Sequence, residues 1–309
     1  MSIRQLPDDV VGKIRSSAII TSLNGVVCGL LKNSLDASAN KINIYVDYGR
    51  GNCTVEDNGG GISPAEFAQD GGLGKHHSTS KYPPSSGIHG RQGTFLASVA
   101  VLSLMTVTSH HQRFNSHNSI AIHHGQVLKR HLPSLPGERL ETFENGTRVA
   151  VHNLFGSMPV RVKHRATLFS DRSGIDKEWG RLVHDVIALL IAWPTDVSVL
   201  LREMKEQREL RLRSSDVVNL ATRTSRLLIQ ASLAESFGIE SWVPVSASAG
   251  HIVIKGCICL DPVATRRSQF ISLGILPILN EYGNNVLYEE VNKVFKNSSF
   301  GVVERGVKV

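Results

Sequence analysis

The stretch Asn33-Ser34-Leu35-Asp36-Ala37, followed by Asp57-Asn58-Gly59-Gly60-Gly61-Ile62, decides how the first part of this chain folds. Around the first stretch, apolar residues recur at helical spacing and predict a helix over 22–38. These residues are Leu23, Val26, Val27, Leu30, Leu31 and Leu35. The alternation of Ile42, Ile44 and Val46 predicts a half-buried strand, and residues 53–56 predict a second strand after a turn. We therefore expect Asn33 on a buried helix and Asp57 at the end of a strand, beside a glycine-rich turn.

Asn33 and Asp57 have the chemistry needed to hold a magnesium nucleotide. The amide oxygen of Asn33 is a hard ligand suited to Mg²⁺, an ion that keeps several waters and binds phosphate oxygens. The carboxylate of Asp57 can accept a hydrogen bond from an exocyclic amine such as that of adenine, and Gly59 and Gly61 let the backbone approach the base. One turn before Asn33, on the same helix face, a polar group could act on water near the terminal phosphate, but this residue is Gly29.

A second glycine-rich segment, Gly90-Arg91-Gln92-Gly93, leads directly into a helix predicted over 94–103. Free amides and the helix dipole at such an N-terminus favour an anion. This segment therefore predicts a phosphate site.

Composition places the chain among globular proteins. Of its 309 residues, 41% are hydrophobic and 20% are charged, and its net charge of +7 suggests a polyanionic partner. Its four cysteines do not form a secreted-type disulfide framework, and for Cys257 and Cys259 we expect buried thiols rather than a metal site. With no signal peptide and no apolar run long enough to span a bilayer, we expect a cytosolic or nuclear protein that does not contact membranes.

The order of elements predicts an α+β fold. After the first strand pair come a helix start at 63–66, a loop over 70–92, the helix over 94–103, and strands near 104–109, 119–124, 126–130 and 147–152. A helix over 176–192 ends at Trp193-Pro194. A second unit is expected from 195 to 309, with strands near 196–201, 208–213, 251–260 and 270–280 and helices over 220–237 and 285–296. The expected domains are thus 1–194 and 195–309.

Four segments carry a resemblance to a known family: residues 26–37, 56–62, 77–81 and 90–98. In this order they resemble the N-terminal ATPase region of MutL-type DNA mismatch-repair proteins, of the GHKL class shared by gyrase, chaperone and histidine-kinase ATP domains. Gly146-Thr147 and residues 153–161 add to the match, and the start, residues 3–7, is most similar to the third eukaryotic MutL homologue. The resemblance implies a GHKL-type ATP-binding α/β sandwich, followed by a smaller transducer-like domain of the ribosomal S5 domain 2-like type that is incomplete at its C-terminus.

The resemblance also implies roles for particular residues. Asn33 would be the magnesium ligand, Asp57 would bind adenine, and Gly59 and Gly61 would shape the base pocket. The remaining implied ATP contacts are Thr79, Lys81, Gly90, Gly93, Thr94, Phe95, Leu96 and Thr147. The implied cofactors are therefore ATP and Mg²⁺.

Departures from the family pattern gather at the phosphate end. The family's general-base Glu aligns with Gly29, and its Gly-Phe-Arg-Gly-Glu-Ala aligns with residues 90–95, so that an Arg and a Glu are replaced by Gln92 and Thr94. No segment corresponds to the family's transducer lysine, its C-terminal dimerisation domain or its nuclease motif. We therefore expect ATP binding with impaired hydrolysis, and assign no catalytic residue.

DNA is the expected macromolecular partner. Arg161, Lys163 and Arg165 cluster after the family signature, and more basic residues alternate with acids over 202–213. Such residues give salt-sensitive, sequence-independent binding to phosphates. The leading hypothesis is a nuclear mismatch-repair or meiotic-recombination subunit that binds double-stranded DNA and pairs with another MutL homologue through ATP-driven N-terminal dimerisation. The alternatives are a non-hydrolysing DNA-binding scaffold and a truncated, degenerate family member.

Overall fold

The computed structural model describes residues 6–83, 87–90, 92–215, 219–234, 241–261, 266–280 and 283–297, without the side chains of residues 8 and 9. Arg91 and the end of the helix expected over 220–237 lie outside these residues, as does most of the start at 3–7. The chain divides into two compact units. The first comprises Met1–Val186 and Val197–Arg213, and the second Ile187–Asp196 and Ser214–Val309.

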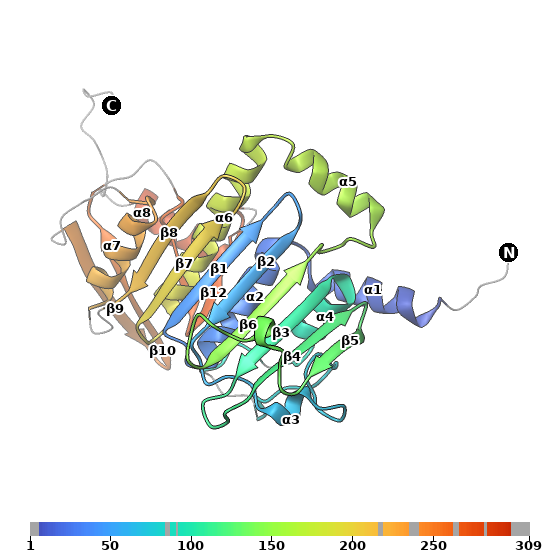
Figure 1. Ribbon diagram of the computed structural model, residues 1–309. Helices are drawn as coiled ribbons and strands as arrows, with labels where there is room; N and C mark the ends of the chain where they lie inside the picture. The colour runs from blue at the N-terminus through green and yellow to red at the C-terminus, as the bar shows by residue number, and fades with distance from the viewer. Residues whose placement is uncertain are drawn as a thin grey trace. The chain divides into compact units, whose positions relative to one another are not determined.

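An eight-stranded sheet forms the centre of the first unit (Figure 1). Its spatial order is β5-β4-β3-β6-β2-β1-β7-β8. The strands are β1 Lys41–Asp47, β2 Asn52–Asp57, β3 Leu104–His110, β4 His117–His123, β5 Gln126–His131, β6 Gly146–His152, β7 Val197–Glu203 and β8 Arg208–Ser214. β1 is antiparallel to β2 but parallel to β7, so a strand from early in the chain pairs with one from its second half.

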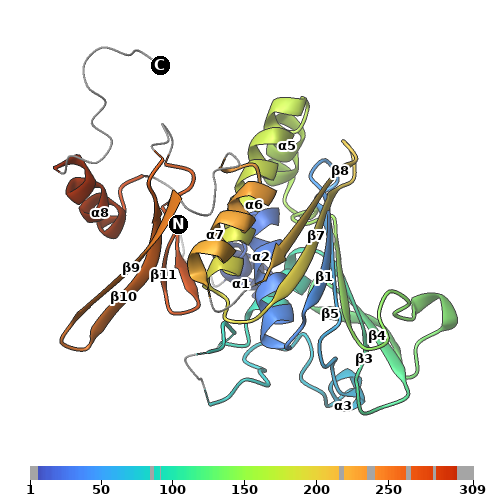
Figure 2. The same ribbon diagram turned by 90° about the vertical axis from the view of Figure 1, so that its left-hand side faces the viewer.

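Helices pack against one face of this sheet (Figure 2). They include α2 Leu23–Asp36, α4 Phe95–Leu102 and α6 Arg172–Ala192, whereas α1 Asp8–Ile19 contacts α4. α2 begins where Ser22 Oγ accepts a hydrogen bond from the Gly25 amide at 3.0 Å, which is the usual role of an N-cap serine. Its apolar face is buried together with Ile42, Ile44 and Val46 of β1, so the helix and strand periods predicted from sequence meet in one core.

Three further helical segments complete the first unit: α3 Pro64–Phe67, the 3₁₀ turn η1 Pro136–Glu138 and α5 Pro159–Leu168. The sequence pattern does not predict α5, because this helix is short, has no buried residue and shows no strong apolar period. Among the described residues, no single helix is long and apolar enough to cross a membrane. α1 from Val10 and α2 meet those criteria only together, as a pair bent by 75°.

The division between the units differs from the boundary expected at residue 195. β7 and β8, which were assigned to the second unit, complete the sheet of the first. Val197, Val199 and Leu201 are buried, as an inward-facing row of a sheet strand should be. Trp193-Pro194 ends a helix, but a helix end carries no information about which sheet the next strand joins.

The second unit contains α7 Leu220–Gln230, β9 Trp242–Ala249, β10 Ile252–Cys259, β11 Ile271–Leu273, β12 Leu276–Ile278 and α8 Val286–Lys296. β9 and β10 form one antiparallel hairpin, and β11 and β12 form another. The single strand expected over 270–280 is thus two short strands, and β9 was not predicted. Arg223 of α7 is buried and donates hydrogen bonds to Ser214 Oγ and to the Leu190 carbonyl, both at 2.7 Å.

Candidate nucleotide site

Asp57 is buried at the end of β2, where three neighbours orient its carboxylate. Ser34 Oγ donates to Oδ2 at 2.7 Å, and the Gly59 amide donates to Oδ1 at 2.9 Å. Burial raises the pKa of Asp57, whereas hydrogen bonds from Ser34, Gly59 and the Thr147 amide lower it; burial has the larger effect. Ser34 follows Asn33 on α2, so this bond joins the helix to the strand end as the two motifs require.

The backbone packs closely around this carboxylate. Gly61 has a φ of +75°, and a Cβ there would lie 2.3 Å from the His110 carbonyl oxygen. Only glycine both adopts this positive φ readily and has no Cβ that would clash with the carbonyl oxygen. Thr147 lies directly opposite Asp57 in the sheet, and its Oγ1 is 3.0 Å from Ser109 Oγ. Asp57, Gly59, Gly61 and Thr147 therefore form one cluster.

Asn33 lies on α2 within a second cluster, which is strongly charged. Lys81 Nζ donates to Asp36 Oδ2 at 2.6 Å and to Asn33 Oδ1 at 3.3 Å. The Gly90 amide also donates to Asp36 Oδ2, and the amide and Nδ1 of His89 both lie 3.0 Å from Oδ1. Burial alone raises the pKa of Asp36, but the hydrogen bonds from His89, Lys81 and Gly90 together hold it well below its usual range. This network joins the 77–83 loop and the glycine-rich segment to the helix.

The rest of the predicted phosphate loop lies beside this cluster. Gly93 has a φ of +61°, and a Cβ there would lie 2.5 Å from the Ser78 carbonyl oxygen. Thr94 precedes α4, and Phe95 and Leu96 begin it. Thr79 is exposed, and its Oγ1 accepts a hydrogen bond from the Lys81 amide at 3.1 Å. The sequence therefore identified the segments that meet here, but not Ser34, Asp36 or His89. Asp36 lies three residues after Asn33, a spacing that places both on one helix face.

Gly29 lies in contact with an aromatic ring. A Cβ at this position would lie 2.3 Å from both Cε2 and Cζ of Phe95, and 3.0 Å from Cε1. The sequence assigned Phe95 only a backbone role. The ring contact could not have been anticipated, because it depends on how α2 and α4 are placed in space.

The magnesium that the sequence implies is compatible with these donors. Asn33 Oδ1 is a neutral oxygen beside the phosphate loop, and Mg²⁺ is usually held by one or two protein oxygens together with phosphates and waters. The described residues contain no cluster of three or more His, Cys, Asp and Glu side chains that could hold a metal without such phosphates. The Lys81 ammonium, which now contacts Asn33 Oδ1, would have to move.

Two of the three residues predicted to bind DNA are engaged within the protein. Arg165 donates to the Leu154 carbonyl at 2.7 Å and to Asn153 Oδ1 at 3.2 Å. Arg161 lies over the Phe155 ring, 4.2 Å from its centroid. Lys163 is exposed on α5. In the basic segment 202–213, Arg202 and Arg211 both pair with Glu209, and Arg208 pairs with Asp176.

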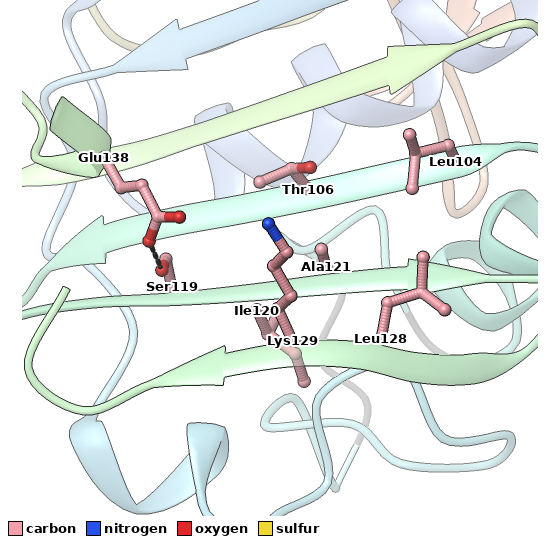
Figure 3. Close-up of a pocket in the computed structure, with 8 residues that line it drawn as sticks. All are labelled: Leu104, Thr106, Ser119, Ile120, Ala121, Leu128, Lys129 and Glu138. Carbon is pink, nitrogen blue, oxygen red and sulfur yellow. Dashed lines mark hydrogen bonds between the residues drawn. The ribbon is translucent and has the colours of Figure 1, made fainter. Parts of the chain in front are cut away.

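A cavity of ≈ 240 Å³ lies on the face of the sheet opposite α2 and α4 (Figure 3). None of the predicted site residues lines it. Ser119 Oγ donates to Glu138 at 2.6 Å, and the Lys129 side chain extends toward Thr106. The Leu104 and Thr106 side chains alternate with the buried Met105 and Val107, so the cavity faces away from α2 and α4.

Comparison with known proteins supports the fold reached above. Residues 20–148 match the family model described as "Histidine kinase-, DNA gyrase B-, and HSP90-like ATPase". A solved structure, the Aquifex aeolicus MutL ATPase domain complexed with ADP, has a TM-score of 0.61 at 22% identity, covering 89% of each chain. The crystal structure of the N-terminal domain of a DNA repair protein has a TM-score of 0.68 at 21% identity, covering 94% of this chain and 83% of that one. The first unit thus has the mixed α/β fold of GHKL ATPase domains.

Two sequence relatives of this chain are DNA mismatch-repair proteins. The DNA mismatch repair protein MutL of Carboxydothermus hydrogenoformans is 33% identical over 167 residues, which are 52% of this chain and 27% of that protein. The DNA mismatch repair protein PMS1 of Arabidopsis thaliana is 32% identical over 187 residues, 59% of this chain and 18% of that protein. The chain is therefore similar in sequence to MutL-type DNA mismatch-repair proteins. The chain spans about a quarter or less of the length of these two relatives.

Proposed function

We propose that the first unit binds magnesium ATP through the two clusters around Asp57 and Asn33. The observation that carries this proposal is the buried carboxylate of Asp57, oriented by Ser34 and Gly59 at a strand end where only glycine fits at position 61. A buried carboxylate is retained at an energetic disadvantage, which favours a binding role. Asp57 would accept a hydrogen bond from the exocyclic amine of adenine, with Gly59, Gly61 and Thr147 around the base.

The phosphates would lie at the glycine-rich segment. Gly90, Gly93 and the amides of Thr94, Phe95 and Leu96 precede or begin α4, where free amides favour an anion. Thr79 and Lys81 would approach from the loop, and Asn33 would hold the magnesium. When bound, magnesium supplies positive charge that neutralises the phosphate oxygens.

In its cellular role we propose a subunit of DNA mismatch repair, or of meiotic recombination, that acts in the nucleus. It would pair with another MutL homologue through ATP-driven N-terminal dimerisation and bind double-stranded DNA with little sequence preference. The named relatives, both DNA mismatch-repair proteins, support the repair role. The second unit would serve as the transducer-like domain.

Hydrolysis by this domain would be weak, because Gly29 offers no side chain that could take a proton from water. A second candidate function follows from the same residue: a DNA-binding scaffold that does not turn over nucleotide. Nucleotide-dependent protection from proteolysis, measured with a non-hydrolysable ATP analogue, separates the two. Protection supports a nucleotide-driven subunit, and its absence supports the scaffold.

Asp57→Asn tests the binding proposal directly. The amide keeps the shape of the side chain but presents a donor to the adenine amine, so affinity for a fluorescent ATP analogue with magnesium should fall at least tenfold, or about 1.4 kcal/mol. Its melting temperature should be unchanged or higher, because burial raises the pKa of Asp57 and the charged form is therefore disfavoured in the folded protein. Glu141→Gln, the same change at an exposed position, is the matched control. Equal affinity in both variants would overturn the proposal.

A further inference from the structure

Gly29 and Phe95 form a complementary packing pair beside the proposed magnesium ligand. Gly29 lies one turn before Asn33 on α2, and Phe95 is the first residue of α4. The Phe95 ring occupies the volume that a side chain at position 29 would need, since two ring carbons lie 2.3 Å from an ideal Cβ there. A methyl group at 29 would clash with the ring, and a longer side chain would clash with it more severely.

We propose that Phe95 blocks hydrolysis together with the missing side chain at Gly29, because its ring fills the position from which a base would act on the attacking water. The proposal rests on the proposed nucleotide function and deepens it. The loss of a polar side chain at 29 alone would leave a space that water could enter. The ring replaces that space with hydrocarbon, so the site binds nucleotide and retains it.

The chemistry of hydrolysis explains why this position matters. Water oxygen forms a bond to the terminal phosphorus while the bond from that phosphorus to the bridging oxygen breaks, and ADP leaves. The water proton must pass to a base within hydrogen-bond reach, about 2.6–3.2 Å between heavy atoms. Carbon atoms of a phenyl ring cannot accept it.

The other acids near the site do not replace such a base. Both oxygens of Asp36 already accept hydrogen bonds, from Lys81 and Gly90 on one side and His89 on the other. Glu56 precedes Asp57 on β2, so its side chain leaves the opposite face of the sheet. There it accepts a hydrogen bond from Thr142 Oγ1 at 2.9 Å and pairs with Arg148 at 3.6 Å.

The test compares four proteins: wild type, Gly29→Glu, Phe95→Ala and the double variant. Binding is measured with a fluorescent non-hydrolysable ATP analogue and magnesium, and hydrolysis is measured in single-turnover assays with ATP. We expect no gain for either single variant, since one has no room for the carboxylate and the other has no base. The double variant should hydrolyse ATP at least tenfold faster than wild type, toward the 10²–10⁴ range typical of a general base.

Three outcomes are informative. A double variant that binds the analogue but hydrolyses ATP no faster than wild type overturns the inference, and so does a Gly29→Glu single variant that equals the double. Wild-type protein that fails to bind the analogue would instead refute the proposed nucleotide function, which is a separate result.

A thermal-stability cycle keeps the inference testable if the glutamate variants do not fold. Gly29→Ala should lower the melting temperature of wild type but have little effect in the Phe95→Ala background, because the ring is then absent. Gly12→Ala, on α1 with no atom within 4 Å of its Cβ, is the control for a helix glycine and should not lower the melting temperature. Equal destabilisation by Gly29→Ala in both backgrounds contradicts the packing pair.

Discussion

The ammonium of Lys81 lies 2.6 Å from the carboxylate of Asp36, whose side chain is completely buried. This ion pair connects a loop before the glycine-rich segment to the helix that carries Asn33. Because His89 and Gly90 donate to the same carboxylate, one acidic side chain holds together two segments that would surround the phosphates.

Replacing Lys81 tests how much this connection stabilises the fold. In Lys81→Met the charge is removed, but Asp36 keeps its donors from His89 and Gly90. We expect the free energy of unfolding to fall by about 1–3 kcal/mol, the range for removing one partner of a buried hydrogen-bonded group. Lys75→Met, at an exposed lysine that donates to the Gln69 carbonyl, should change it by less than about 0.5 kcal/mol. Urea unfolding measures the free energy of unfolding of both variants. Equal losses in the two would show that the ion pair between Lys81 and Asp36 does not stabilise the fold.

A histidine pair should make stability depend on pH. His110 and His117 lie opposite each other on β3 and β4, and their rings stack at 4.2 Å. Burial, followed by the charges of His110 and Arg139, lowers the pKa of His117. The unfolded chain therefore binds this proton more readily, so the contribution to stability is present above the ordinary pKa of about 6.5 and is lost as pH falls through the folded value.

His117→Gln should accordingly lose less stability than wild type between about pH 7.5 and pH 5.5. The measurement is the urea midpoint at each pH. His164→Gln, at an exposed position on α5, should leave the wild-type difference in place. A pH dependence that His117→Gln leaves unaltered would rule out the stacked pair as its source.

The basic residues of α5 should separate into structural and DNA-contacting positions. Arg165→Ala removes two hydrogen bonds to the 153–154 segment and should destabilise the protein by about 1–2 kcal/mol. Lys163→Ala should leave stability nearly unchanged but weaken binding to a random-sequence duplex and reduce the slope of log affinity against log salt by about 1. Anisotropy titrations over a salt series measure this. An unchanged slope in Lys163→Ala would exclude this lysine from the DNA surface.

Cys53 should be unreactive while the protein is folded. Its side chain is buried on β2, and burial raises the pKa of the thiol to about 12. Alkylation needs the thiolate, so iodoacetamide at neutral pH should label Cys53 only after unfolding. Cys259, which is partly exposed, serves as an internal reference. Mass spectrometry of peptides from native and denatured samples gives both rates, and rapid native labelling of Cys53 would contradict the burial of β2.

Local patterns were sufficient for much of the fold. The helical spacing from Leu23 to Leu35 and the alternation over Ile42, Ile44 and Val46 predicted α2 and β1, because each pattern reports a single buried face. The glycine-rich segments indicated where the backbone must turn tightly, and Gly61 has the positive φ expected of such a turn. Asn33 and Asp57 were therefore placed on the correct elements, although their binding roles stay proposals.

Contacts between distant segments could not be predicted in this way. The Phe95 ring reaches Gly29 only because the start of α4 lies against α2, and Lys81 reaches Asp36 only because of the path of its loop. No periodic signal in one chain specifies either contact. The observed division differs from the boundary expected at residue 195 for the same reason. The parallel pairing between β1 and β7 cannot be recognised from the sequence of either strand alone.

That parallel pairing constrains the order in which the protein can fold as it is synthesised. Ile42 pairs with Val199, so β1 leaves the ribosome long before its neighbour exists. Until β7 emerges, one edge of β1 has unpaired amides and carbonyls beside an apolar face, a surface that recruits other chains. A chain ended before Val197 would keep that edge permanently. The helix and strands that carry Asn33 and Asp57 therefore depend, for a complete sheet, on the much later strand β7, in which Val199 pairs with Ile42.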